Sequence, residues 1–279
     1  MPESFGDRLA TAFETRGRLC VGIDPHPFLL EQWGLPDDAA GLREFGLRVV
    51  DAAAGVIGIV KPQVAFFERH GSAGYGALES VLAAAREAGL LVIADVKRGD
   101  VGTSVAAYGD AWLTPGSPLE ADAMTAVAYQ GVESLRAPLD LARAGGKGVF
   151  VLAATSNPEG VRIQTAVIRG TGTTVAAGIV EDVHQLNAPT ATLGSTGVVL
   201  GATVDLADYG IGDGLLGHTP ILAPGFGEQG AVFGDIAKLY GAAAGNVIVA
   251  VSRSVLRSGP DEIDFAIVRQ AAELAEAAP

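Results

Sequence analysis

The stretch Leu90-Leu91-Val92-Ile93-Ala94-Asp95-Val96-Lys97-Arg98-Gly99-Asp100 decides both the fold and the chemistry of this chain. Its apolar first half predicts a buried strand, which the glycine near its end is expected to terminate. Alternate residues of a strand share a face, so Asp95 and Lys97 should lie side by side, together with Leu91 and Ile93. Buried charges are costly unless they are paired. The two charged residues must therefore pair with each other, with further charges or with a ligand.

The length suits one large domain or two small ones, and the composition indicates a soluble protein. The chain has 279 residues, of which 49% are hydrophobic, and its 38 glycines and 14 prolines allow many turns. A net charge of −13 argues against nucleic acid or an anionic membrane as the main partner. We find no apolar run near the roughly 20 residues of a membrane helix, and no secretory signal. With one cysteine, Cys20, we expect a reducing, cytoplasmic setting and a single domain over residues 1–279.

Short apolar runs alternate with helical patterns along the whole chain. The eight predicted strands are 19–24, 56–61, 90–97, 122–126, 148–155, 197–202, 219–223 and 247–252. Apolar stripes at helical spacing predict helices within 78–85, 175–186, 232–240 and 263–274, another after Pro36, and a weak sixth helix within 205–217. This alternation favours a (β/α)8 TIM barrel. A doubly wound open sheet is the alternative, but no G-x-G-x-x-G motif follows a strand.

Charged residues stand where the first three predicted strands end. These are Asp24, Lys61 and the pair Asp95 and Lys97. A single charge at a strand end is usually solvated, but a barrel gathers the carboxyl ends of its strands, where active sites lie. Lys61 beside Asp95 and Lys97 would give alternating charges that satisfy one another. A salt-bridge network that only plugs the barrel mouth is the structural alternative.

The last two strand ends predict an anion site. The segment Pro224-Gly225-Phe226-Gly227-Glu228-Gln229-Gly230 is a glycine-rich loop expected to enter a helix, and Arg253 follows the eighth strand. Many barrels bind phosphate with the loops after strands seven and eight, using backbone N–H groups, a helix N-terminus and a guanidinium. The glycines alone would fit an ordinary mobile turn. Together with Arg253 they favour a phosphate site.

Other patterns carry less chemistry. The sequence has four histidines: His26, His70, His184 and His218. They lie far apart and have no cysteine companion, so we expect no metal site. The acidic residues Asp110, Glu120 and Asp122 are expected to lie on the solvated surface. The irregular stretch 157–174 is long enough to be a functional loop.

The stretch Asp95 to Val101 resembles the D-x-K-x-x-D-[IV] signature of the orotidine 5′-phosphate decarboxylase family. Lys61 before Pro62 and Asp24 before Pro25 match earlier positions of that family. Its later motifs are matched by Thr155-Ser156-Asn157-Pro158, by the segment 224–230 and by Ser252-Arg253-Ser254. The similarity runs from about Leu19 to Leu256 and is greatest to the longer bacterial branch, often called type 2.

The resemblance implies a reaction and a role for each matched residue. It implies cofactor-independent decarboxylation of orotidine 5′-monophosphate to uridine 5′-monophosphate, the last step of de novo pyrimidine synthesis. The implied charge network is Lys61, Asp95, Lys97 as proton donor, and Asp100 from the other subunit of a homodimer. The implied substrate contacts are Asp24 for the ribose, Ser156 for the pyrimidine, Gln229 and Arg253 for the phosphate, and Ser104 or its neighbour Thr103 for the role of a family threonine. No cofactor and no metal are implied.

Two departures and two alternatives accompany this hypothesis. The family usually has threonine at the place of Ser104, and an asparagine-proline pattern where this chain has Ala126-Val127-Ala128-Tyr129-Gln130-Gly131. The first alternative is a related barrel family, a magnesium-dependent sugar-phosphate decarboxylase or synthase. Those relatives have a carboxylate where this chain has Lys61, which argues against them. The second is a non-catalytic barrel that binds a phosphate-bearing ligand.

Overall fold

The protein forms a closed parallel barrel. The computed structural model describes residues 2–188, 190 and 192–277. The strands are β1 (Leu19–Ile23), β2 (Ile59–Pro62), β3 (Leu91–Arg98), β4 (Ala123–Val127), β5 (Gly148–Ala154), β6 (Thr196–Leu200), β7 (Ile221–Pro224) and β8 (Val247–Val251). They pair in sequence order, and β8 pairs with β1 to close the sheet. The predicted (β/α)8 barrel is confirmed, while a single domain over 1–279 stays a prediction.

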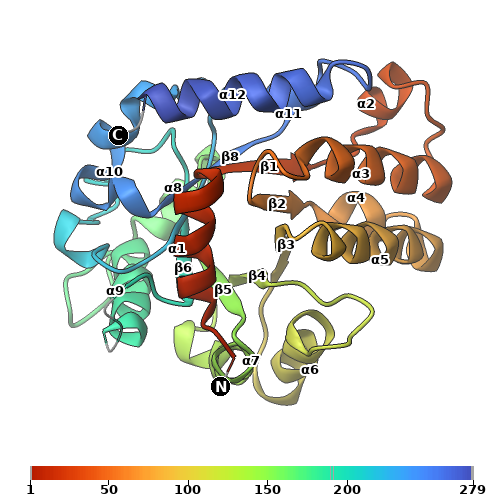
Figure 1. Cartoon of the computed structure of the whole chain (residues 1–279). Helices are drawn as coiled ribbons and strands as arrows, with labels where there is room; N and C mark the ends of the chain where they lie inside the picture. Colours follow the sequence, from red (N-terminus) through yellow and green to blue (C-terminus); the bar gives the residue numbers. More distant parts are fainter. Residues whose placement is uncertain (1, 189, 191, 278–279) are drawn as a thin grey trace.

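Helices surround the barrel (Figure 1). They are α1 (Phe5–Arg16), α2 (Pro27–Gln32), α3 (Ala39–Ala53), α4 (Val64–Glu68), α5 (Gly71–Glu87), α6 (Gly102–Leu113), α7 (Arg136–Gly145), α8 (Pro158–Gln164), α9 (Val175–Asn187), α10 (Ile236–Tyr240), α11 (Arg253–Leu256) and α12 (Ile263–Ala277). Short 3₁₀ turns lie at Val132–Leu135, Asp213–Leu215, Phe233–Asp235 and Gly241–Asn246. Within the described residues, no helix combines the length and the apolar character needed to cross a membrane.

The helix predictions were partly wrong in the last third of the chain. The patterns after Pro36 and within 78–85, 175–186 and 263–274 are confirmed as α3, α5, α9 and α12. The stripe within 232–240 forms a 3₁₀ turn followed by the five-residue α10. The segment 205–217 holds only the 3₁₀ turn Asp213–Leu215. The segment 205–217 contains four glycines. Glycine weakens helices because it loses the most backbone freedom on folding.

The side chains of strand β3 contribute to two apolar layers, one inside the barrel and one between the strands and the helices. Leu91 and Ile93 face the barrel interior, where they join a cluster that includes Cys20 and Phe150. The intervening side chains of β3 belong instead to the larger apolar layer between strands and helices. The expected alternation is therefore confirmed. It directs the side chain of Asp95, two residues beyond Ile93, toward the cavity at the barrel mouth.

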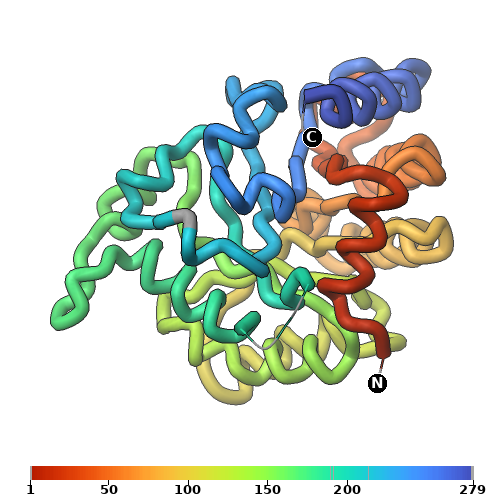
Figure 2. The backbone as a smooth tube through the Cα atoms, turned by 60° about the vertical axis from the view of Figure 1, so that its left-hand side comes forward, coloured from red at the N-terminus to blue at the C-terminus, as the bar shows by residue number. Residues whose placement is uncertain are grey.

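Helix α1, which the sequence patterns did not predict, closes the opposite end of the barrel. Figures 1 and 2 show it in red, lying across the strands. Its Phe5 ring meets Phe150 edge-on, with ring centroids 5.9 Å apart. A Cβ atom on Gly148 would lie 2.6 Å from the Phe5 ring, so only glycine fits where α1 meets the start of β5. This cover seals the apolar interior and leaves the other end of the barrel open for a site.

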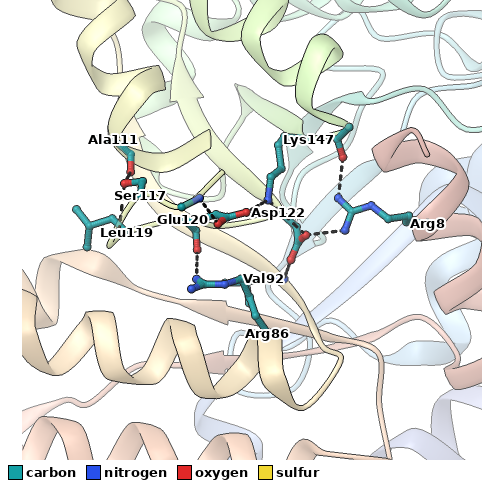
Figure 3. Close-up of polar contacts among 11 residues, drawn as sticks. Arg8, Arg86, Val92, Ala111, Ser117, Leu119, Glu120, Asp122 and Lys147 are labelled. Atoms are coloured by element: carbon teal, nitrogen blue, oxygen red, sulfur yellow. Dashed lines mark hydrogen bonds and ion pairs between the residues drawn. The ribbon is translucent and has the colours of Figure 1, made fainter. Parts of the chain in front are cut away.

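Asp122 lies at the centre of an ion network beside α1 (Figure 3). One carboxylate oxygen accepts a hydrogen bond from the Val92 N–H at 2.9 Å, and the other pairs with Arg8 at 2.6 Å. Lys147 lies 3.9 Å from Asp122 and 2.7 Å from Glu120. The network joins α1 to the amino ends of β3, β4 and β5.

The prediction that Asp110, Glu120 and Asp122 lie on the solvated surface was therefore wrong for Asp122. Asp122 is buried, and only 6% of its surface is exposed. Glu120 is partly buried and paired, whereas Asp110 lies exposed on α6 as expected. The arginine and lysine partners come from segments far away in the sequence, which is why local acidity alone misled the interpretation.

Candidate active site

A cavity of about 790 Å³ opens at the carboxyl ends of the strands. Asp24, Lys61, Asp95 and Lys97 line one side, where β1, β2 and β3 end. Ser156, Gln229 and Arg253 also line it, from the ends of β5, β7 and β8. The structure thus gathers seven of the predicted site residues in one place. The green segment 157–174 projects outward from the rest of the chain (Figure 2). Its Ile163 and Gln164 also line the cavity.

Asp95 lies between two lysines. Its Oδ2 is 3.0 Å from Lys61 Nζ, and its Oδ1 is 2.6 Å from Lys97 Nζ. The side chains of Lys61 and Asp95 are 10% and 9% exposed, whereas that of Lys97 is 44% exposed. The buried pair therefore anchors a lysine whose ammonium reaches into the cavity.

The charges of the buried pair stabilise each other. Burial acts to lower the pKa of Lys61, but the carboxylates of Asp95 and Asp24 outweigh it and raise that pKa above its ordinary value. Burial likewise acts to raise the pKa of Asp95, but Lys61 and Lys97 outweigh it and hold that pKa well below its ordinary value. Both groups are therefore charged throughout the neutral pH range.

Two further donors complete the hydrogen bonding of Asp95. Gln63 Nε2 donates to Oδ2 at 3.0 Å, and the Thr125 hydroxyl donates to Oδ1 at 2.9 Å. With the two lysines, each carboxylate oxygen accepts two hydrogen bonds. A carboxylate with this many donors is fixed in its orientation.

The ends of β1 and β8 add an acid and a serine. Asp24 Oδ1 and Ser252 Oγ are both buried and have no hydrogen-bond partner among the described residues. A Cβ atom on Gly22 would lie 3.0 Å from both Asp24 Oδ2 and Ser252 Cβ, so the glycine leaves room for these two side chains. Both residues line the cavity, so a ligand bound there would lie beside them.

The glycine-rich loop after β7 adopts the conformations that its glycines allow. Gly225, Gly227 and Gly230 have φ values of 119°, 75° and 101°, where other residues are strained. Gln229 accepts a hydrogen bond of 3.2 Å from the Ser156 hydroxyl, which links this loop to the end of β5. The prediction of a helix directly after the loop was wrong, because α10 begins only at Ile236. The predicted anion site would therefore use the loop and Arg253, the first residue of the four-residue α11, and not the start of α10.

Three residues that were predicted to belong to the site do not lie in the cavity of their own chain. Asp100 accepts a hydrogen bond of 2.8 Å from the Val101 N–H. In the part of the chain that the structure describes, it forms no ion pair with Lys97 and does not line the cavity. Thr103 and Ser104 are exposed in the first turn of α6. The chain alone thus assembles three of the four predicted network charges.

Three residues of the cavity were missed as site residues. Gln63 stands two residues after Lys61, on the same side of the chain, and that spacing was the available signal. Thr125 is a polar residue inside an apolar strand, which is a weaker signal. His26 lines the cavity with its ring 4.3 Å from that of Phe66, and it was considered only as a metal ligand.

A (β/α)8 barrel with a lysine–carboxylate network and a glycine-rich loop at its mouth is typical of enzymes that act on small phosphorylated compounds. The sequence profile of the orotidine 5′-phosphate decarboxylase / HUMPS family matches residues 17–264. The chain belongs to this family, as predicted.

Its relatives agree over almost the whole chain. A protein of Salinispora arenicola named orotidine 5′-phosphate decarboxylase is 50% identical over 271 residues, which are 97% of this chain and 95% of that protein. One of Streptomyces coelicolor with the same name is 50% identical over 260 residues, covering 93% and 92%. A crystal structure from Streptomyces avermitilis, provisionally assigned as an orotidine 5′-phosphate decarboxylase, has 48% identity and a TM-score of 0.94, covering 99% and 96%. The predicted enzyme class is confirmed.

Proposed function

We propose that this chain converts orotidine 5′-monophosphate to uridine 5′-monophosphate without a cofactor, as the last step of de novo pyrimidine synthesis. The observation that carries the proposal is Asp95 held between Lys61 and Lys97 at the barrel mouth. Relatives that bear the name of this activity, at 50% identity over nearly the full chain, support it.

Lys97 supplies both charge and a proton. The bond between ring carbon C6 and the carboxylate breaks, carbon dioxide leaves, and the electron pair stays on C6. The ammonium of Lys97 stabilises that negative charge and then transfers its proton to C6, after which solvent reprotonates the amine. A fixed charge placed where negative charge develops is an effective form of catalysis because no reorganisation is needed during the reaction.

Asp95 orients that ammonium. Its short contact with Lys97 Nζ, 2.6 Å, and its four donors hold both groups in one arrangement. A secondary effect is repulsion between Asp95 and the substrate carboxylate, which raises the energy of the bound substrate. We rank orientation and charge stabilisation first.

The remaining residues bind parts of the substrate away from the broken bond. Asp24 accepts a hydrogen bond from a ribose hydroxyl, since it lines the cavity and its Oδ1 has no partner among the described residues. Ser156 contacts the pyrimidine, and Gln229 and Arg253 bind the phosphate. Ser156 already contacts Gln229 at 3.2 Å, so phosphate binding and pyrimidine binding are physically linked. Binding energy at the phosphate can then drive closure of the loop 224–230.

Magnesium-dependent chemistry is the principal rival. It requires a carboxylate at the end of β2, where this chain has Lys61, whose ammonium would repel a divalent cation. Among the described residues, no three His, Cys, Asp or Glu side chains gather in a geometry that could hold a metal ion.

The loss of orotidine 5′-monophosphate, followed spectrophotometrically, is therefore expected to be unchanged within about twofold by excess chelator. The control is the same preparation with magnesium restored. Activity that is abolished by chelator and recovered with magnesium would reject the proposal in favour of the rival. A complete absence of turnover in both conditions would favour a phosphate-binding barrel without catalysis.

The fourth network charge is proposed to come from a second subunit. Asp100 lies just past the end of β3, and its carboxylate accepts a hydrogen bond from the Val101 N–H, while its own Lys97 pairs with Asp95. In a symmetric homodimer, each Asp100 would complete the site of the other chain, and Ser104 or Thr103 would reach the same substrate. We assign this homodimer to the cytoplasm.

A mixed dimer tests this sharing. A heterodimer of one Lys97→Ala chain and one Asp100→Ala chain, purified through two different tags, should show roughly half of the wild-type activity, since one of its two sites is intact. Each variant homodimer is the control and should be nearly inactive. A heterodimer as inactive as its parents would place Asp100 in the site of its own chain.

A further inference from the structure

Lys97 has an unusual backbone conformation. Its φ is +49°, and it is the only non-glycine residue with a positive φ in the described part of the chain. A residue with a Cβ atom adopts this left-handed region rarely, and its surroundings must hold it there. In the proposed reaction Lys97 is the proton donor, so whatever holds this conformation also determines where the proton lies.

The neighbouring strand supplies the restraint. The pairing of β3 with β4 shifts register between Ala94, opposite Met124, and Arg98, opposite Ala126. Three residues of β3, 95–97, thus lie opposite the single residue Thr125 of β4. Within this bulge the Lys97 N–H donates a hydrogen bond of 2.9 Å to the Thr125 hydroxyl rather than to a β4 carbonyl. Bulges of this kind redirect a side chain beside a functional site.

The Thr125 hydroxyl also has a fixed direction. It is completely buried, and it donates its only proton to Asp95 Oδ1 at 2.9 Å. That oxygen also accepts from Lys97 Nζ at 2.6 Å. The hydroxyl therefore joins the backbone of Lys97 to the carboxylate that holds the ammonium of the same residue. This closed ring fixes both ends of the lysine.

We propose that Thr125 is a positioning residue that locks the left-handed turn at Lys97 and thereby places its ammonium against the substrate. This inference rests on the proposed function, in which Lys97 donates the proton. Thr125 itself does not touch the reacting atoms. Misplacing a catalytic group by about 1 Å can lower the rate about a hundredfold, so the effect should appear in kcat far more than in KM.

Gln63 offers an internal comparison. It also donates to Asp95, at 3.0 Å, but to the other carboxylate oxygen and with no hydrogen bond to the backbone of Lys97. If Thr125 mattered only as one more donor to Asp95, loss of either donor should have the same effect. The proposal requires that loss of the Thr125 hydroxyl be the more damaging.

The test uses variants that differ by one oxygen atom. Thr125→Ser and Thr125→Ala both lack the methyl group, and only the serine keeps the hydroxyl. We expect Thr125→Ala and the isosteric Thr125→Val to lower kcat by about 10–100-fold with KM changed less than about threefold, and Thr125→Ser to stay within about threefold of wild type. Gln63→Leu should lower kcat less than Thr125→Val does. Amide exchange in a peptide spanning 95–100, measured by mass spectrometry, should accelerate in Thr125→Ala but not in Thr125→Ser.

The readouts separate the possible failures. A purely structural role would lower the melting temperature of the alanine and serine variants alike and leave kcat unchanged, and this result would overturn the proposal. Equal kcat in Thr125→Ser and Thr125→Ala would overturn it too, even if Thr125→Val did not fold. If the unaltered chain had no decarboxylase activity, the proposed function would fail first, while the exchange measurement would still report on the turn at Lys97.

Discussion

Replacing Lys97 with alanine is expected to lower kcat by about 10⁴-fold or more while uridine 5′-monophosphate still binds. The variant loses the charge that stabilises the carbanion and the acid that protonates it, each of which contributes about 10²–10⁴-fold in enzymes. The fold should persist, because the Lys97 side chain is 44% exposed and its removal leaves Asp95 paired with Lys61. Steady-state kinetics and calorimetric binding of the product measure the two effects separately.

Lys97→Arg is the matched control for charge. Arginine keeps the positive charge but does not release a proton at neutral pH, and its planar head does not reproduce the contact with Asp95 Oδ1. This variant should therefore also be strongly impaired. Turnover of Lys97→Arg close to that of wild type would mean that charge alone is sufficient, and turnover of Lys97→Ala within tenfold of wild type would reject the assigned role.

How far the sequence predicts this site depends on the range of the interaction. Asp95 and Lys97 lie on one strand, so the period of a strand places them together. Lys61 joins them because a parallel barrel brings strand ends to one edge. These features follow from local pattern and fold class, and the structure agrees with them.

Other features had no local signal. The positive φ of Lys97 occurs in the bulge opposite Thr125. A lysine in a sequence does not predict a left-handed turn, because lysine rarely adopts that conformation. Likewise, the burial of Asp122 depends on Arg8 from α1, which is 114 positions away in the sequence. Contacts of this kind are set by tertiary packing, so composition and spacing could not have supplied them.

Replacing Asp95 with asparagine is expected to lower kcat by about 10³-fold and to destabilise the protein at neutral pH by about 3 kcal/mol. The substitution keeps the shape but leaves Lys61 buried without its main countercharge. Breaking a buried ion pair in this way costs about 3–5 kcal/mol of unfolding free energy. We expect a value at the lower end of this range, because the asparagine oxygen still accepts one hydrogen bond. In addition, Lys97, the second partner of Asp95, is partly solvated and loses less. Kinetics and denaturant unfolding at pH 7 measure both effects.

The difference in unfolding free energy between wild type and Asp95→Asn should also decrease as the pH falls. The pKa of Asp95 is lower in the folded protein than the value of about 3.9 in an unfolded chain. Its ionisation therefore stabilises the wild type fully above about pH 5, and this contribution is lost as the pH falls below about 4. The gap in unfolding free energy between wild type and Asp95→Asn should accordingly narrow on acidification. Asp110→Asn, which changes an exposed carboxylate on α6, should show almost no gap at any pH. A gap for Asp95→Asn that stayed constant from pH 7 to pH 3 would mean that the charge of Asp95 does not stabilise the buried lysine.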